Sequence, residues 1–159
     1  MLISKQSQRG VTLVEAMIAL LVVSIGLLGI ASLQLTAMSQ NTSALNHSQA
    51  VWIAYNMSDR IRANISEFQN YHGIDTDTGY SQDCVNSACS TAQMVTADAA
   101  DWMTMVQNLP SGRGTVVDNN NGILTVTVMW DDEGSGATGT GCNPTNANDL
   151  TCYRMAVAQ

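Results

Sequence analysis

One carboxylate, that of Glu15, lies inside an otherwise uncharged and mostly apolar run of this 159-residue chain. The run VTLVEAMIALLVVSIGLLGIASLQL begins directly after Arg9 and Gly10, and Glu15 is the only formal charge between Arg9 and Asp59. A carboxylate within a membrane segment costs about 3 kcal/mol on insertion scales, so such a residue usually has a partner and a function. The sequence therefore raises the question of which positive group pairs with Glu15.

The apolar run is long enough to cross a bilayer once. Residues 16–33 are apolar apart from four small residues, Ser24, Gly26, Gly29 and Ser32. Lys5 and Arg9 precede the run and no further Lys or Arg follows until Arg60, which predicts a cytoplasmic N-terminus and an exported remainder. A cleaved secretory signal is one alternative, but the apolar core is too long and no A-x-A-like site closes it. A plain single-pass anchor is another, and it does not explain Glu15.

Composition argues against two classes of function. The formal net charge is −7 with only six Lys and Arg, and binding to a phosphate backbone needs clustered basic residues. His47 and His72 are the only histidines; neither stands in a nucleophile motif, and we expect both to be solvated. No hydrolase, kinase or nucleotide-binding signature is present. We therefore predict no enzyme activity, no cofactor and no direct nucleic-acid partner.

The region after the apolar run has no Pro or Gly as far as about Phe68 and predicts a continuous helix. Its apolar residues recur at three- and four-residue spacing on one face: Ala50, Ala54, Met57, Ile61, Ile65 and Phe68. Gly26 and Gly29, in the first half, each cost about 1 kcal/mol relative to Ala. They mark either close helix approach in a membrane or a soft point that stretches when subunits pack.

The remainder of the chain predicts a small head. Residues 69–95 are polar and loop-like, and TADAADWMTMVQNLP predicts a short helix with Asp98 as its cap and Asp101 in its first turn. GTVVDNNNGILTVTVMWDD predicts a hairpin with its turn at residues 119–122. A loop at residues 131–150 and a last short strand, CYRMAVA, follow. The predicted fold class is α+β, a long N-terminal helix packed on a small antiparallel sheet.

Four cysteines all follow the proposed membrane crossing, and an oxidising compartment makes disulfides the default. Of the three pairings, Cys84–Cys89 with Cys142–Cys152 is favoured because each pair brackets a polar loop with few apolar residues to order it. A zinc site would need closer spacing. DTDTGYSQD resembles the start of a calcium loop, but its glycine is misplaced and the closing Glu is absent. We predict no metal site.

The N-terminal residues resemble a known signal. RG followed by VTLVEAMIALLVVSIGLLGIASLQL looks like the class III signal of type IV prepilins. In that family a basic leader ends in Gly, an intramembrane aspartyl prepilin peptidase cuts after it, and the new amine is methylated. The resemblance implies cleavage between Gly10 and Val11, N-methylation of Val11 and a subunit-assembly role for Glu15. Val11 departs from the family, in which Phe or Met is commoner.

Later segments resemble the PilV branch of minor pilins, the type IV pilus modification proteins. They are SIGLLGIASLQL, NMSDRIRAN, LPSGRG and LTVTVMWDD. This resemblance implies a low-abundance subunit that joins other minor pilins and the major pilin at the inner-membrane assembly platform. The resulting tip complex primes assembly and carries, in many systems, a PilY-type adhesin. A type II secretion minor pseudopilin shares the signal but fewer of the later motifs, and a membrane-anchored periplasmic binding domain is a third alternative.

The resemblance also divides the chain into four parts. Residues 1–10 are the leader, residues 11–35 the transmembrane and assembly half of the helix, residues 36–68 its amphipathic half, and residues 69–159 the periplasmic or extracellular head. The same resemblance implies the pilin fold. The expected location is the bacterial inner membrane, single-pass with the head in the periplasm, and then the pilus at the cell surface, where it supports motility and adhesion.

Cleavage would supply the missing partner of Glu15. It creates a positively charged amine at Val11, which attracts a carboxylate far more strongly in a low-dielectric bundle than in water. The pair is neutral overall, whereas an unpaired carboxylate is costly in lipid. Pairing would therefore favour extraction of the subunit into a helical bundle. Both the amine of the same chain and that of a neighbour remain open as the partner.

Processing at Gly10 gives the first prediction. In a Gly10→Val variant the peptidase should no longer cut, because the resemblance assigns the glycine to the cleavage site. The mass of the purified chain should then include the ten residues before Val11. A Gly10→Val chain that still begins at Val11 would contradict the assigned site.

Overall fold

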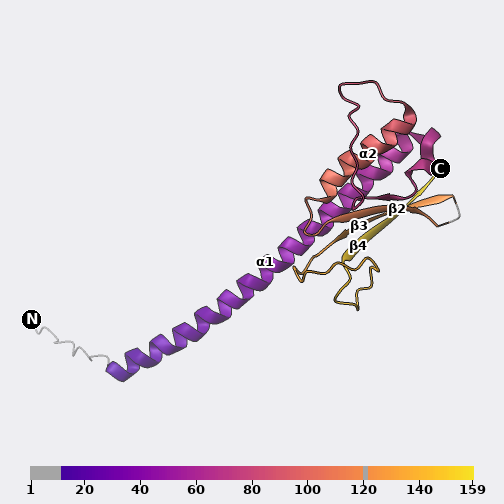
Figure 1. The fold of residues 1–159 in the computed structure, drawn as a ribbon. Coiled ribbons are helices and arrows are strands. Elements are labelled where there is room, and N and C mark those ends of the chain that lie inside the picture. The colour runs from indigo at the N-terminus through magenta and orange to yellow at the C-terminus, as the bar shows by residue number, and fades with distance from the viewer. Residues whose placement is uncertain (1–11, 120–121) are drawn as a thin grey trace, which may run out of the picture. The chain divides into compact units, whose positions relative to one another are not determined.

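The computed structural model describes residues 12–119 and 122–159. The chain forms two compact units, residues 1–41 and residues 42–159. Helix α1, Leu13–Ala63, contributes to both of them (Figure 1). Gly10 and Val11 lie outside the described residues, as do Asn120 and Asn121 in the predicted hairpin turn. The two units are described separately below.

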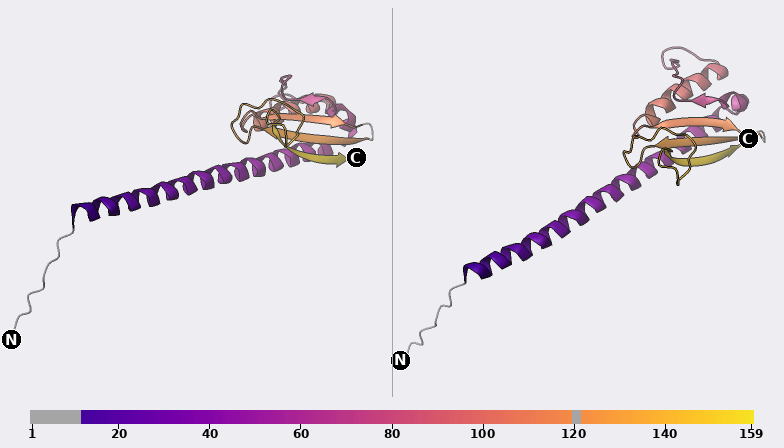
Figure 2. Two further views of the ribbon diagram at one scale, coloured as in Figure 1. Left: turned by 90° about the horizontal axis from the view of Figure 1, so that it is seen from below. Right: turned by 60° about the horizontal axis from the view of Figure 1, so that its bottom comes forward.

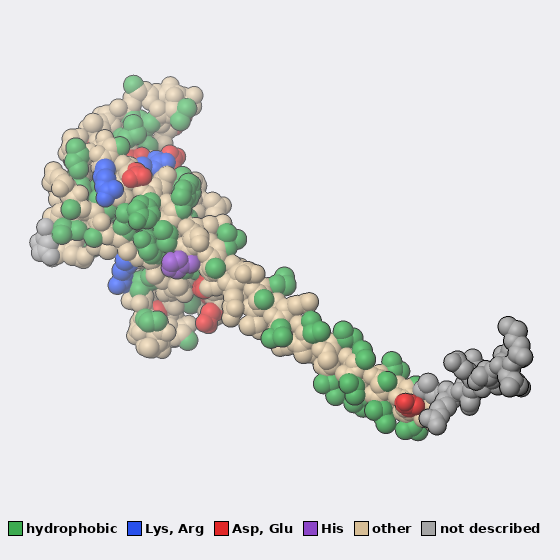
Figure 3. Space-filling model, turned by 180° about the vertical axis from the view of Figure 1, so that it is seen from behind, with side chains coloured by type: hydrophobic (Ala, Val, Ile, Leu, Met, Phe, Trp, Pro, Cys, Tyr) green, Lys and Arg blue, Asp and Glu red, His purple; other side chains and the backbone are tan. Residues whose placement is uncertain are grey.

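The described part of the first unit, residues 12–41, consists of Thr12 and the first half of α1. Every one of its residues is exposed. Hydrophobic side chains crowd the surface of this half of the helix (Figure 3). A surface helix of a globular protein buries one apolar stripe against the core, whereas an apolar surface on all sides is typical of a membrane span or a bundle of helices.

The second unit is a four-stranded antiparallel sheet against which helices pack, which confirms the α+β prediction. The strand order is β1-β2-β3-β4, with β1 at Ile74–Asp75, β2 at Arg113–Asp118, β3 at Ile123–Trp130 and β4 at Thr151–Ala158. Figure 2 shows these strands in two further views. One sheet face carries four alternate residues of β3, all buried: Leu124, Val126, Val128 and Trp130.

The core lies between this face, the second half of α1 and helix α2, Thr91–Val106. Trp102 of α2 is fully buried, and its Nε1 donates a hydrogen bond to the Ile53 carbonyl of α1 at 3.0 Å. Its ring lies against Gly114 of β2, where an added Cβ would come within 2.4 Å of the indole. Glycine at this position therefore lets the sheet approach the tryptophan.

Helix α1 ends at Ala63, so the prediction of a helix as far as Phe68 was wrong. A 3-10 helix, η1, follows at Ile65–Tyr71. Between them Asn64 leaves the helical conformation and its side chain donates to the Thr91 carbonyl at 2.8 Å. The change of axis takes Ile65 off the apolar stripe, and it is 43% exposed. Phe68 remains buried because η1 turns it back onto the core.

Helix α2 begins earlier than predicted, and Asp98 is not its cap. Ser90 caps the helix and forms a capping box with Gln93, in which each side chain bonds the other residue's backbone N–H. The S-x-x-Q spacing carries this signal, but the polar surroundings favoured a loop. Asp98 and Asp101 lie within the helix instead. The segment predicted as a loop, residues 69–95, also contains the end of η1 and the whole of β1.

Two disulfides close loops of the second unit. They join Cys84 to Cys89 and Cys142 to Cys152, which confirms the predicted pairing. The second one links the loop of residues 131–150 to β4. This loop covers part of the outer sheet face, where Met129 packs with Ala137 and Leu150 in a small second core.

The cap of α2 gives a prediction for stability. Ser90→Ala removes the acceptor for the Gln93 N–H and should lower the free energy of unfolding of the second unit by about 1 kcal/mol. Thr104→Ala on the same helix is the control, since Thr104 is exposed and alanine favours a helix interior. Unfolding in detergent followed by tryptophan fluorescence measures both, and equal stability of the two variants would contradict the capping role.

Candidate functional site

The start of α1 brings Glu15 close to a residue that sequence reasoning missed. The Glu15 backbone N–H donates to Thr12 Oγ1 at 3.2 Å, and the Ala16 N–H donates to the Thr12 carbonyl. Thr12 is therefore the N-cap of α1 and Glu15 its third helical residue. T-x-x-E is the spacing of a capping box, so the signal was present in the sequence. Glu15 also places its negative charge at the positive end of the helix.

The Glu15 side chain is exposed, and within residues 12–119 and 122–159 it has no ion-pair partner. Its neighbours are apolar and also exposed, among them Leu13, Val14 and Ile18. Val11, whose amine is expected to supply the cation after cleavage, lies outside the described part of the chain. The pairing of Glu15 stays a prediction.

Two hydroxyl groups in the apolar half of α1 are bonded within the helix itself. By length and composition, α1 is the one described helix that could cross a membrane. The Ser24 hydroxyl donates to the Leu20 carbonyl at 2.7 Å, and the Thr36 hydroxyl donates to the Ser32 carbonyl at 3.1 Å. Hydroxyl groups bonded within their own helix can enter a bilayer without an unsatisfied donor.

Gly26 and Gly29 do not interrupt α1, which is helical through both positions. An added Cβ at either would meet nothing within 4 Å. Nothing among the described residues therefore requires glycine there. A contact with another helix and a soft point in α1 remain as the two interpretations. Both stay predictions.

An arginine pins the end of α1 to α2. Arg60 Nη1 lies 2.8 Å from Asp98 Oδ1 and 3.1 Å from Asp101 Oδ2, and the Tyr71 hydroxyl of η1 donates to Asp98 Oδ2 at 2.5 Å. Burial opposes the charge of Arg60, but the hydrogen bonds to Asp98 and Asp101 outweigh it and raise its pKa. Burial, with the bond to Asp98, raises the pKa of Tyr71. This cluster joins three segments that are distant in sequence.

A second carboxylate, Asp132, joins α1 to the end of β3. It accepts hydrogen bonds from the Ser43 hydroxyl at 2.5 Å, from Trp130 Nε1 at 2.9 Å and from Asn46 Nδ2 at 3.4 Å. Burial opposes its charge, but these three donors outweigh burial and hold the pKa of Asp132 below its ordinary value. The ring of His47, one turn from Ser43, is exposed and contacts Trp130 edge-on at 5.9 Å.

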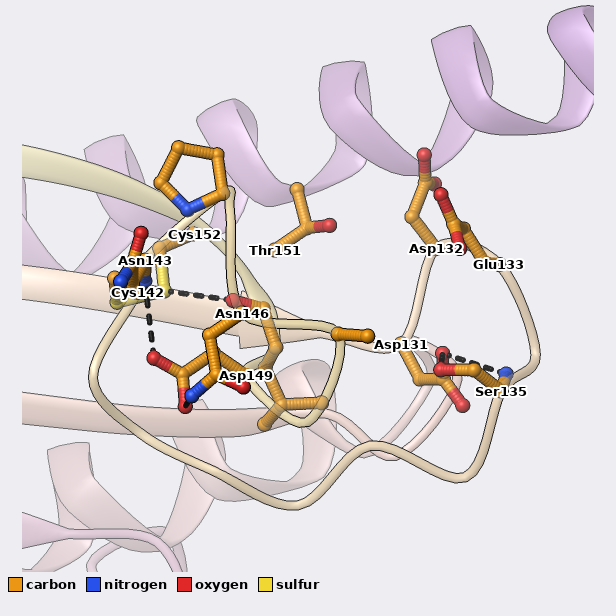
Figure 4. Close-up of a pocket in the computed structure, with 13 residues that line it drawn as sticks. Asp131, Asp132, Glu133, Ser135, Cys142, Asn143, Asn146, Asp149, Thr151 and Cys152 are labelled. Carbon is orange, nitrogen blue, oxygen red and sulfur yellow. Dashed lines mark hydrogen bonds between the residues drawn. A yellow bond between two sulfur atoms is a disulfide. The ribbon is translucent and has the colours of Figure 1, made fainter.

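The loop of residues 131–150 encloses a cavity of about 470 Å³ rich in oxygen atoms (Figure 4). Two of its carboxylates, those of Asp131 and Asp149, bond to the loop itself. Asp131 accepts from the Gly136 N–H at 2.7 Å and the Ser135 N–H at 3.0 Å. The Gly136 bond contributes most to holding the pKa of Asp131 below its ordinary value. Asp149 accepts from the Asn143 N–H and from Asn146 Nδ2, both at 3.1 Å. These bonds order a loop that has few apolar residues.

The calcium-like segment has a different partner. Asp75 Oδ2 lies 2.6 Å from Arg113 Nη2, and Asp77 Oδ2 lies 2.7 Å from Arg113 Nη1. A guanidinium therefore occupies the place that a cation would take between these carboxylates. Among the described residues no group of three or more His, Cys, Asp or Glu side chains could hold a metal. His72, predicted to be only solvated, accepts a bond from the Asp118 N–H at its Nδ1.

Two family models match consecutive parts of the chain. Residues 5–31 match the prokaryotic N-terminal methylation motif, and residues 32–100 match a family described as type IV pilin Tt1218. Together they support a pilin or pseudopilin role. No curated protein and no solved structure matched the chain.

The two matches bear on how the N-terminal part of the chain is processed and anchored. A pilin with this motif implies processing by prepilin peptidase and assembly with other pilins. The motif and the exposed apolar half of α1 suit anchoring in a membrane before assembly. Pilins are structural proteins. In this chain the carboxylates of Asp98 and Asp132 join elements of the fold.

Asp132 and Asp131 predict how stability depends on pH. Their pKa values are lowered in the folded state, so the stabilisation is present above the unfolded value of about 3.9 and is lost as the pH falls through the folded value. Thermal unfolding followed between about pH 2 and pH 6 should therefore show a midpoint that falls on acidification, starting at about pH 4.

Substitution identifies the carboxylate responsible. Asp132→Asn should lower the midpoint at pH 6 and weaken its fall in acid. Glu133→Gln at the next residue is the control, since Glu133 is exposed and has no hydrogen bond or ion pair within the described part of the chain. An Asp132→Asn profile that matches the Glu133→Gln profile would show that Asp132 does not stabilise the fold.

Proposed function

We propose that the chain is a PilV-like minor pilin of the type IV pilus that acts in the initiation and tip complex of pilus assembly. One observation carries the proposal. Glu15 stands alone among exposed apolar side chains in the first turn of α1, within the residues that match the methylation motif. A carboxylate in that setting needs a cation once the helix is surrounded by lipid or by other helices.

The leader supplies that cation when it is removed. Prepilin peptidase cuts between Gly10 and Val11, and Val11 becomes an N-methylated amine directly before the N-cap Thr12. A positive charge at the positive end of a helix is unfavourable, so this amine also needs a counter-charge. Glu15 of a neighbouring subunit or of the same chain provides it. The ion pair removes two costs at once and sets the axial register of the subunits.

The cost of leaving the bilayer is then low. The apolar half of α1 exchanges lipid for the helices of other subunits, with the hydroxyl groups of Ser24 and Thr36 already bonded within the helix. Gly26 and Gly29 have open space around them, so neighbouring helices can approach closely there. In this proposal residues 11–35 enter the filament, residues 36–68 connect to the head, and residues 69–159 form the head.

Contacts between heads have a candidate surface on the second half of α1. Three large apolar side chains there are exposed, Leu45, Trp52 and Tyr55. Aromatic residues are enriched in the buried centres of protein interfaces. We propose that this surface contacts other minor pilins or the major pilin, and that the complex forms at the inner-membrane platform and bears a PilY-type adhesin. The filament would then serve surface motility and adhesion.

A type II secretion minor pseudopilin is the second candidate, because the motif and the pilin match support both roles. In both candidates the N-terminus is cytoplasmic, the leader is removed by prepilin peptidase, and Glu15 acts in subunit assembly. They differ in partners. Co-purification of the native chain with pilus tip proteins supports the minor pilin, and co-purification with secretion components supports the pseudopilin. A membrane-anchored periplasmic binding domain would show neither and would begin at Met1.

Substitution of Glu15 tests the proposal. Glu15→Ala should leave cleavage after Gly10 largely intact and lower surface piliation, because the subunit loses the ion pair that favours its extraction. Cleavage is measured by the mass of the membrane form, and piliation by the amount of sheared pili.

Two further substitutions separate charge from shape. Glu15→Gln keeps the size of the side chain and should lower surface piliation as much as Glu15→Ala does. Glu15→Asp keeps the charge and should retain part of the piliation. Normal piliation and normal incorporation of the Glu15→Gln chain would remove the proposed mechanism.

A further inference from the structure

The outer face of the sheet carries a row of polar side chains across three strands. Thr115 of β2 pairs with Thr127 of β3, and Thr127 pairs with Arg154 of β4. Because paired residues of antiparallel strands point to the same side of a sheet, their three side chains lie on one face. Val116, Val126 and Val128, next to them in sequence, are buried on the core face. The polar row therefore faces away from the helices.

A groove of about 460 Å³ lies over this row. Its size is within the range of small-molecule sites, about 300–1,000 Å³. Besides the three residues of the row, Thr125 of β3 and Thr140 of the 131–150 loop line it. Thr127 is only 8% exposed, so the groove has depth at its centre. Four hydroxyl groups, each able to donate and accept a hydrogen bond, thus line one groove.

Three charged residues line the groove, Arg113, Arg154 and Asp75, in a chain of net charge −7. Arg113 is held by Asp75 and Asp77 through its two terminal nitrogens. Arg154 is exposed and has no hydrogen bond or ion pair within the part of the chain that the structure describes. A single available guanidinium therefore stands beside a set of neutral hydroxyl groups.

From this arrangement we propose that the groove binds an acidic sugar residue of a polysaccharide. Arg154 pairs with the sugar carboxylate, for which a guanidinium offers two parallel N–H donors. Thr115, Thr127 and Thr140 bond the sugar hydroxyls. One carboxylate among several hydroxyls is the composition of a uronic acid, and it matches one cation among several hydroxyls. The inference does not rest on the proposed role in assembly.

Two other anionic ligands fit the groove less well. A nucleic acid carries a phosphate at every nucleotide and needs several cations and stacking aromatic rings, whereas this groove offers one available cation and no aromatic lining residue among the described ones. An extended acidic peptide binds a sheet by adding to its edge through main-chain hydrogen bonds. The groove lies on the face of the sheet.

The test uses the full chain in nanodiscs and short oligomers of galacturonate, of alginate and of hyaluronan as probes. At least one probe should bind. Its methyl ester, which has the same sugars without the charge, should bind about tenfold more weakly or worse. Arg154→Gln should cause the same loss for the charged probe. For the ester, Arg154→Gln should cause no further loss, because the two changes remove one interaction.

Two more variants complete the experiment. Thr127→Val keeps the side-chain shape and should weaken binding of the acid and of the ester alike. Arg62→Gln removes one charge from an exposed position on α1 and should leave binding unchanged, with tryptophan fluorescence confirming the fold of each variant. Failure of all three probes to bind, equal binding of acid and ester, or full binding by Arg154→Gln would overturn the proposal. Equal or tighter binding of an oligoglutamate peptide would assign the groove to an acidic peptide instead.

Discussion

A helix with apolar side chains on every side is unstable when it is exposed to water. If it carries one carboxylate, that carboxylate needs a cation once the helix is in lipid or in a bundle of helices. The first half of α1 imposes both constraints, because all of its described residues are exposed and Glu15 is its single charge. Lipid satisfies the first constraint but not the second. A bundle of like helices with a cation near each Glu15 satisfies both. The proposed function follows from this constraint more than from any feature of the head.

The second half of α1 solves a different problem, since it must hold a small head together. It does so with one apolar stripe that packs on the core and with a group of polar contacts near each of its ends. Near the start of this half, Asp132 accepts hydrogen bonds from Ser43 and Asn46. At its end, Arg60 forms ion pairs with Asp98 and Asp101. Charged hydrogen bonds of this kind are directional, so they specify how strands and helices meet where the core is small. Two disulfides do the same for the polar loops.

Much of this architecture could be predicted from local pattern. The apolar half of α1 follows from composition, β3 from strict alternation, and both disulfides from the loops that they bracket. Contacts between distant segments could not be predicted. Asp98 looks like a helix cap in sequence, and its role is clear only when Arg60 and Tyr71 are seen beside it.

The errors at element ends have the same origin. Asn64 ends α1 because its side chain finds the Thr91 carbonyl, 27 residues away in sequence. The capping box of Ser90 and the cap Thr12 were local signals and could have been recognised. The outer groove depends on the register of three strands, which no local pattern states. The cleavage site at Gly10 and Val11 lies outside the described residues and rests on the motif.

We propose that removal of the leader creates the cation that Glu15 needs. The most direct measurement is the intact mass of the native chain recovered from assembled filaments. We expect a mass that corresponds to residues 11–159 with a methyl group on the amine of Val11 and with all four cysteines oxidised. A chain in those filaments that still begins at Met1 would contradict it, because Glu15 would then have entered the bundle without that amine.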